Sequence, residues 1–191
     1  MDSRAPGGWS GAEVKASFNG IPSVLYYTRA AHFLGLWKSE RLLMERFLPD
    51  RKSDLVEAGC GAGRVTLGLW RLGYRRICAF DFANELLDQA RSLAVDQRAG
   101  AIVFRCADAT SITRTEFDRG VGEGFSGALF MFNGLMQIPG RARRRAALAG
   151  LHRLCRPGAP LLFTTHDRDS SPTEQILWRL EAGRWERGEQ D

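Results

Sequence analysis

The 191-residue sequence lacks any apolar run that approaches the ~20 residues of a membrane-spanning helix, which argues against an integral membrane protein. Its first ten residues are polar and lack the apolar core of a signal peptide, so we expect no secretion by that route. The four cysteines are widely spaced and none forms Cys-x-x-Cys, so neither a metal site nor a disulfide framework is expected. These features together predict a reduced, cytoplasmic setting.

Lysine is also scarce in this chain. All three lysines precede residue 53 and no Gly-Lys-Ser/Thr occurs, so a Walker-type phosphate loop is absent. The formal net charge is nevertheless +5, because arginine is abundant. Such an excess permits an anionic partner without demanding one, and we do not expect nucleic-acid binding.

Short apolar segments alternate with amphipathic ones between residues 54 and 165. Strands are expected at residues 54–58, 77–80, 101–104, 128–132 and 161–165. Helices are expected at 21–48 (one or two, with Ser39 as a cap), 65–72, 84–95, 141–155 and after a capping box at 171–174. Strands that alternate with helices in this way predict an α/β fold with a doubly wound, mostly parallel sheet.

Polar residues follow four of the predicted strands, and each lies at the strand's carboxyl end. A glycine-rich turn at 59–63 follows the first strand, Asp81 the second, Asp108 the third and Asn133 the fourth. In a doubly wound sheet a ligand binds at these ends, and an acid about 20 residues beyond a glycine turn commonly meets a ribose diol. The alternative is that Asp81 and Asp108 only cap the turns that follow them.

The glycine turn is not a dinucleotide fingerprint, because Arg64 stands where the third glycine of G-x-G-x-x-G belongs. The motif Val-Glu-Ala-Gly-Cys-Gly-Ala-Gly-Arg at 56–64 instead resembles the first motif of class I S-adenosylmethionine-dependent methyltransferases. Ala-Phe-Asp-Phe at 79–82 and Cys-Ala-Asp-Ala at 106–109 are similar to the next two motifs. The segment 130–139 and the Arg-Pro-Gly turn at 156–158 resemble a small-molecule branch of this family. The resemblance covers residues 21–168 and implies a Rossmann-like fold.

The resemblance also implies that this chain binds S-adenosyl-L-methionine and releases S-adenosyl-L-homocysteine. By it, the methionine part of the cofactor lies against Gly59, Gly61 and Gly63. Asp81 accepts hydrogen bonds from the ribose hydroxyls, and Phe82 packs on one face of the adenine.

Further site residues are expected at the next strand ends and on an N-terminal lid. By the resemblance, Asp108 and the N–H of Ala109 bind the adenine edge, and Asn133 lies nearest the methyl group. Tyr27 and Trp37 are available on the lid to cover the cofactor, although these aromatic side chains serve equally well to pack the lid onto the sheet.

Two residues of the first motif and an arginine cluster carry open expectations. Glu57 is expected to order the glycine turn by accepting backbone N–H groups. Arg64 either meets the cofactor carboxylate or points to solvent. The arginines 141, 143, 144 and 145 either bind an anionic acceptor or form the solvated face of a helix.

The predicted function is transfer of a methyl group to an oxygen or nitrogen atom of a small molecule. His166, just past the fifth strand, is the candidate general base, although it can equally hydrogen-bond its own loop. A non-catalytic methyltransferase-like subunit is the first alternative, and an RNA methyltransferase, suggested only by the positive charge, is the second.

The predicted organisation is a flexible N-terminus at 1–20, a helical lid at 21–50, the cofactor-binding domain at 51–168 and a C-terminal helix at 169–191. The chain is C-terminally short compared with the family, so the fifth strand is expected at an exposed edge of the sheet. A partner or a second copy of the chain is a candidate to cover that edge.

Overall fold

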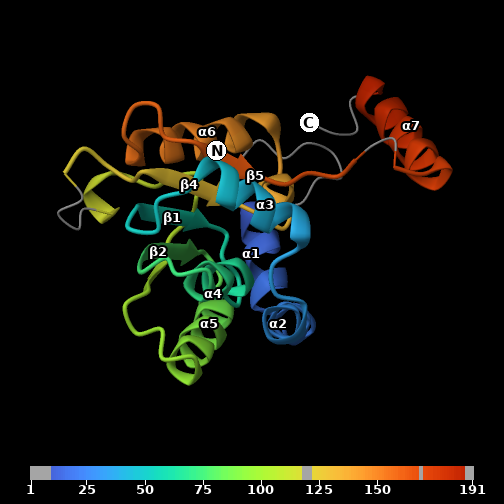
Figure 1. Cartoon of the computed structure of the whole chain (residues 1–191). Helices are drawn as coiled ribbons and strands as arrows, with labels where there is room; N and C mark the ends of the chain where they lie inside the picture. The colour runs from blue at the N-terminus through green and yellow to red at the C-terminus, as the bar shows by residue number, and fades with distance from the viewer. Residues whose placement is uncertain (1–9, 118–121, 168–169, 188–191) are drawn as a thin grey trace.

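The computed structural model describes residues 10–117, 122–167 and 170–187, and in them a single sheet of five parallel strands lies between two layers of helices (Figure 1). The strand order is β3-β2-β1-β4-β5. The chain adds strands outward from β1 to β3 and then crosses back, so that β4 lies on the other side of β1. The strands are β1 (Asp54–Ala58), β2 (Arg76–Asp81), β3 (Val103–Cys106), β4 (Gly127–Phe130) and β5 (Leu161–Phe163). The predicted Rossmann-like doubly wound fold is confirmed.

Helices cover both faces of the sheet because the strands are apolar on both faces. Leu55 and Ile77 pack in one core cluster with α4 and α5, whereas their neighbours Val56 and Cys78 pack in a second cluster with α6. The helices are α1 (Gly11–Asn19), α2 (Ile21–Arg29), a π-helical turn (Ala30–Leu34), α3 (Lys38–Phe47), α4 (Arg64–Arg71), α5 (Asn84–Asp96), α6 (Arg141–Leu154) and α7 (Pro172–Glu186). Two 3₁₀ turns complete the set, η2 (Thr115–Phe117) and η3 (Gly134–Gln137). No helix in these described residues is long and apolar enough to cross a bilayer.

Three local expectations are corrected by the structure. Strand β3 begins two residues later than expected, because Ile102 still donates to the Ala99 carbonyl in the turn that follows α5. Helix α3 is capped at Trp37 rather than at Ser39, since the Glu40 side chain accepts from the Trp37 N–H. Cys106 lies beside a predicted strand, where a free thiol is expected to be a small buried apolar side chain, but it is exposed.

The N-terminal stretch expected to be flexible contains α1. Ser10 and Glu13 form a capping box at its start, and Phe18 near its end packs edge-on against Phe82 with ring centroids 5.5 Å apart. Residues 1–9 of that stretch lie outside the described residues. Helix α1 therefore joins α2 beside the carboxyl end of the sheet.

The sheet has β5 at one edge, as expected from the sequence. Phe163 of this strand is 46% exposed. Helix α7 projects away from the body of the molecule (Figure 1), and its Ile176, Leu177 and Leu180 are exposed.

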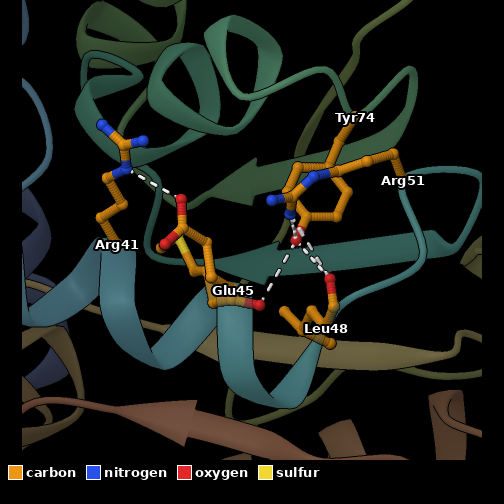
Figure 2. Close-up of polar contacts among 6 residues, drawn as sticks. Arg41, Glu45, Leu48, Arg51 and Tyr74 are labelled. Carbon is orange, nitrogen blue, oxygen red and sulfur yellow. Dashed lines mark hydrogen bonds and ion pairs between the residues drawn. The ribbon is translucent and has the colours of Figure 1, made fainter.

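Tyr74 ties the end of α3 to the sheet. Its ring is fully buried, and its hydroxyl donates to the carbonyl of Leu48 (Figure 2). The hydroxyl also lies 3.4 Å from the Met44 carbonyl. The same hydroxyl accepts from Arg51, whose guanidinium lies over the ring, 4.5 Å from its centroid. The contact with Leu48 satisfies a carbonyl that the end of the helix leaves open.

We expect Tyr74→Phe to lower the free energy of unfolding by about 1–3 kcal/mol, because it removes a buried hydrogen bond and leaves the Leu48 carbonyl only the 3.5 Å contact from Arg51. Urea unfolding measures the change. Tyr26→Phe removes the same hydroxyl from a side chain that is 60% exposed and is the matched control. Equal stability of the two variants would contradict this role of the Tyr74 hydroxyl.

Candidate functional site

A cavity of about 290 Å³ lies at the carboxyl ends of β1, β2, β3 and β4, and α1 and α2 form its outer wall. The glycine turn after β1 and the residues that follow the next three strands all contribute to its lining. The site residues expected from the sequence that line it are Gly59, Gly61, Tyr27, Asp81, Phe82, Asp108 and Ala109.

The glycine turn presents backbone rather than side chains to the cavity. Gly59 and Gly61 have φ angles of +60° and +52°, in the left-handed region that favours glycine. A Cβ on Gly59 would come within 2.6 Å of the Phe130 ring, whereas one on Gly61 would meet nothing closer than Tyr27 at 3.9 Å. Gly63 lies behind the cavity, where a Cβ would press on Ala90 of α5 at 3.2 Å. The third glycine therefore serves helix packing.

Asp81 is the buried carboxylate at the centre of the cavity wall. Its Oδ2 accepts from the Gly61 N–H at 2.8 Å and its Oδ1 from the Ala83 N–H at 2.9 Å. Burial raises the pKa of Asp81, and the backbone hydrogen bonds oppose that rise. The side chain thus joins the end of β2 to the glycine turn of β1.

Asp108 adopts the same local geometry at the end of β3. Its Oδ1 accepts from the N–H and the hydroxyl of Thr110, each at 2.8 Å. Both acids therefore cap the turns that follow them, and both also line the same cavity. Capping a turn therefore does not rule out binding a ligand for either acid.

Glu57 does not hold the glycine turn as expected. Its Oε2 accepts from the Thr66 hydroxyl of α4, and no backbone donor to it is found among the described residues. Burial raises the pKa of Glu57 to about 8, while the Thr66 hydrogen bond and the nearby Arg64 charge act in the opposite direction. The side chain is therefore largely protonated at neutral pH.

The raised pKa of Glu57 makes stability depend on pH. The unfolded chain releases this proton near the ordinary value of 4.5, whereas the folded chain holds it up to about 8. The folded state binds more protons between these values, so the free energy of unfolding falls as pH rises, by up to about 1.4 kcal/mol per pH unit. We expect Glu57→Gln to remove this decrease.

Urea unfolding from about pH 5 to about pH 8 tests the expectation. The free-energy difference between Glu57→Gln and the unsubstituted chain should grow in favour of the variant as pH rises. Glu85→Gln, at an exposed position of α5, is the control and should track the unsubstituted chain. Parallel curves for both variants would contradict a protonated Glu57.

Arg64 neither points to solvent nor stands free for a ligand carboxylate. Its guanidinium makes a two-pronged ion pair with Glu40 of α3, at 2.8 and 2.6 Å, and donates to the Gly35 carbonyl at 2.6 Å. Both side chains are buried. The guanidinium also lies over the ring of Phe132, 4.3 Å from its centroid. This pair fastens α3 of the lid to the first turn of α4.

Sequence reasoning missed Glu40, although a signal for it exists. Helical spacing places Glu40 one turn before Met44, and these are the buried residues of α3. A carboxylate on an apolar helix face needs a buried partner. The capping box of Ser10 and Glu13, which starts α1, was a second readable signal.

Besides Gly63, three predicted site residues are not among those that line the cavity. Asn133 donates its backbone N–H to the Thr164 hydroxyl at 2.7 Å. Trp37 caps α3 and packs edge-on against Phe132, with ring centroids 5.5 Å apart. His166 is exposed. Their roles toward a ligand stay predictions.

Comparison with known proteins bears on this arrangement. Residues 55–158, more than half of the chain, match the family model described as a methyltransferase domain. The chain belongs to this methyltransferase family. The predicted class I S-adenosylmethionine-dependent methyltransferase and its cofactor are thereby confirmed at the level of the family.

Two curated methyltransferases match over most of the chain. The malonyl-[acyl-carrier protein] O-methyltransferase of Enterobacter lignolyticus (strain SCF1) is 28% identical over 74% of the chain and 50% of its own length. The corresponding protein of Pseudescherichia vulneris is 29% identical over 78% of the chain and 55% of its own length. The chain thus spans about half the length of the curated methyltransferases it matches.

Solved structures agree with the methyltransferase fold. The [4+2]-cyclase SpnF has a TM-score of 0.63 at 17% identity, over 83% of this chain and 61% of that one. The glycopeptide N-methyltransferase MtfA, complexed with S-adenosyl-L-methionine, has a TM-score of 0.57 at 17% identity, over 69% of this chain and 55% of that one. At such identities these matches support the fold alone.

Proposed function

We propose that this chain binds S-adenosyl-L-methionine and transfers its methyl group to an oxygen or nitrogen atom of a small molecule. The observation that carries the proposal is the single cavity that collects the glycine turn, Asp81 and Asp108 at the ends of three neighbouring strands. The names of the curated relatives, O-methyltransferases acting on a malonyl group, favour an oxygen acceptor.

The residues present fit this cofactor. Asp81 and Asp108 are positioned to accept hydrogen bonds from hydroxyl and amino groups of an adenosine, and Gly61 leaves backbone open to the methionine part. The negative charge of the two acids also complements a cationic sulfonium.

The chain's own task in the reaction is to position and to exclude water. The bound cofactor supplies an activated methyl group, which the acceptor displaces in line. The lid, fastened through Glu40 and Arg64, holds Tyr27 against the cavity and keeps water from it. No covalent protein nucleophile is needed for such a displacement.

A non-catalytic, partner-binding role is the second candidate. The exposed Phe163 on the edge strand β5 favours it, since an apolar edge is a ready site for a second copy or another protein. We propose a cytoplasmic setting for either role.

Calorimetry with S-adenosyl-L-methionine and S-adenosyl-L-homocysteine tests the cofactor. We expect both to bind at one site per chain. A folded sample that binds neither would refute the proposal. Methyl transfer by the purified chain to any acceptor at an enzymic rate would reject the non-catalytic alternative.

A further inference from the structure

We infer that the acceptor carries a carboxylate and that Lys15 of α1 and Arg143 of α6 bind it; this rests on the proposed function. Both residues line the same cavity as the glycine turn and the two acids. They come from elements far apart in the sequence that meet at the cavity wall.

Arg143 is half-buried and is held in place without being neutralised. In the described part of the chain its side chain makes no hydrogen bond and no ion pair. The start of α1 lies directly on it, since a Cβ on Gly11 would come within 2.2 Å of the Arg143 Nη2. The guanidinium is therefore confined between α1 and α6 with its donors still available to a ligand.

The ionisable residues that line the cavity also favour an anionic ligand at Lys15 and Arg143. Six acidic or basic residues line the cavity, three of them the acids Glu57, Asp81 and Asp108. Of the three cations, Arg64 is already paired with Glu40. Lys15 and Arg143 are thus the lining cations that remain for a ligand.

The arginines at the start of α6 do not all have the same surroundings, so they do not share one role. Arg143 faces the cavity, Arg144 donates to the Ile138 carbonyl at 2.8 Å, and Arg141 and Arg145 are exposed. The solvated face and the anion-binding site are therefore formed by different members of one cluster.

A carboxylate at this place could come from the acceptor or from the cofactor itself. The glycine turn, where the family resemblance places the methionine part, belongs to β1 and α4, whereas Lys15 and Arg143 belong to α1 and α6. The experiment tells the two sources apart.

The experiment compares two thioesters that differ by one carboxylate, malonyl-N-acetylcysteamine and acetyl-N-acetylcysteamine. Calorimetry on the chain saturated with S-adenosyl-L-homocysteine should show at least about tenfold tighter binding of the malonyl thioester. Arg143→Gln and, at an exposed position, Lys15→Gln should each lose most of that preference. Arg145→Gln, an equal loss of charge on the exposed face of α6, should retain it.

The affinity for S-adenosyl-L-homocysteine should be the same in all four proteins. If Arg143→Gln weakens it, the anion is the cofactor's own carboxylate and the inference is wrong. Equal binding of the two thioesters, or binding of neither while the cofactor product binds, also overturns the inference and leaves the proposed function intact. A chain that does not bind the cofactor product overturns both.

Discussion

Asp81→Asn is expected to weaken the binding of S-adenosyl-L-homocysteine by about a hundredfold or more. The proposed contacts are two charge-assisted hydrogen bonds from ribose hydroxyls, each of which contributes about 1.5–3 kcal/mol. Asparagine keeps the shape of the side chain but removes the charge and one acceptor. The Gly61 N–H that now donates to Oδ2 also loses its carboxylate partner.

Calorimetry measures this loss, and thermal unfolding separates it from a loss of structure. Since burial raises the pKa of Asp81, its charge is costly in the folded chain, and removing it offsets part of the stability lost with the acceptor of the Gly61 N–H. Asp88→Asn, at an exposed position of α5 where Asp88 pairs with Arg91 on the surface, is the control. Unchanged affinity in Asp81→Asn would remove Asp81 from the proposed site.

Arg64→Met is expected to lower the free energy of unfolding by about 3–5 kcal/mol, because it leaves the buried Glu40 carboxylate without its partner. The lid should loosen as well, since the pair joins α3 to α4. Urea unfolding measures the stability, and calorimetry with S-adenosyl-L-homocysteine measures the effect on the cavity.

A second ion pair on the same helix provides the control. Arg41 and Glu45 pair at 2.8 Å on the surface (Figure 2), and Arg41→Met should cost about 0.3–0.5 kcal/mol. The double variant Glu40→Leu with Arg64→Met should recover much of the lost stability, because it leaves no charge buried. A single variant Arg64→Met as stable as Arg41→Met would show that the buried pair is not what holds the lid.

Much of the fold could be predicted because its signals are local. Strand β4 is apolar on both faces, and such a segment between helices indicates a covered parallel sheet. The boundaries were less certain where a turn competes with a strand. The late start of β3 follows from the Ile102 hydrogen bond to Ala99, which the apolar pattern of 101–104 does not reveal.

The amino-acid sequence alone determined the order of the strands' end residues, and with it the prediction that Asp81 and Asp108 meet at one edge. That inference needs only the fact that parallel strands share their carboxyl ends. Which cations meet which acids was decided by tertiary structure. Glu40 pairs with Arg64, and α1 packs against Arg143, because of the way the helices pack together. Pairing of side chains from different elements depends on where each whole element lies, and no local sequence pattern encodes that position.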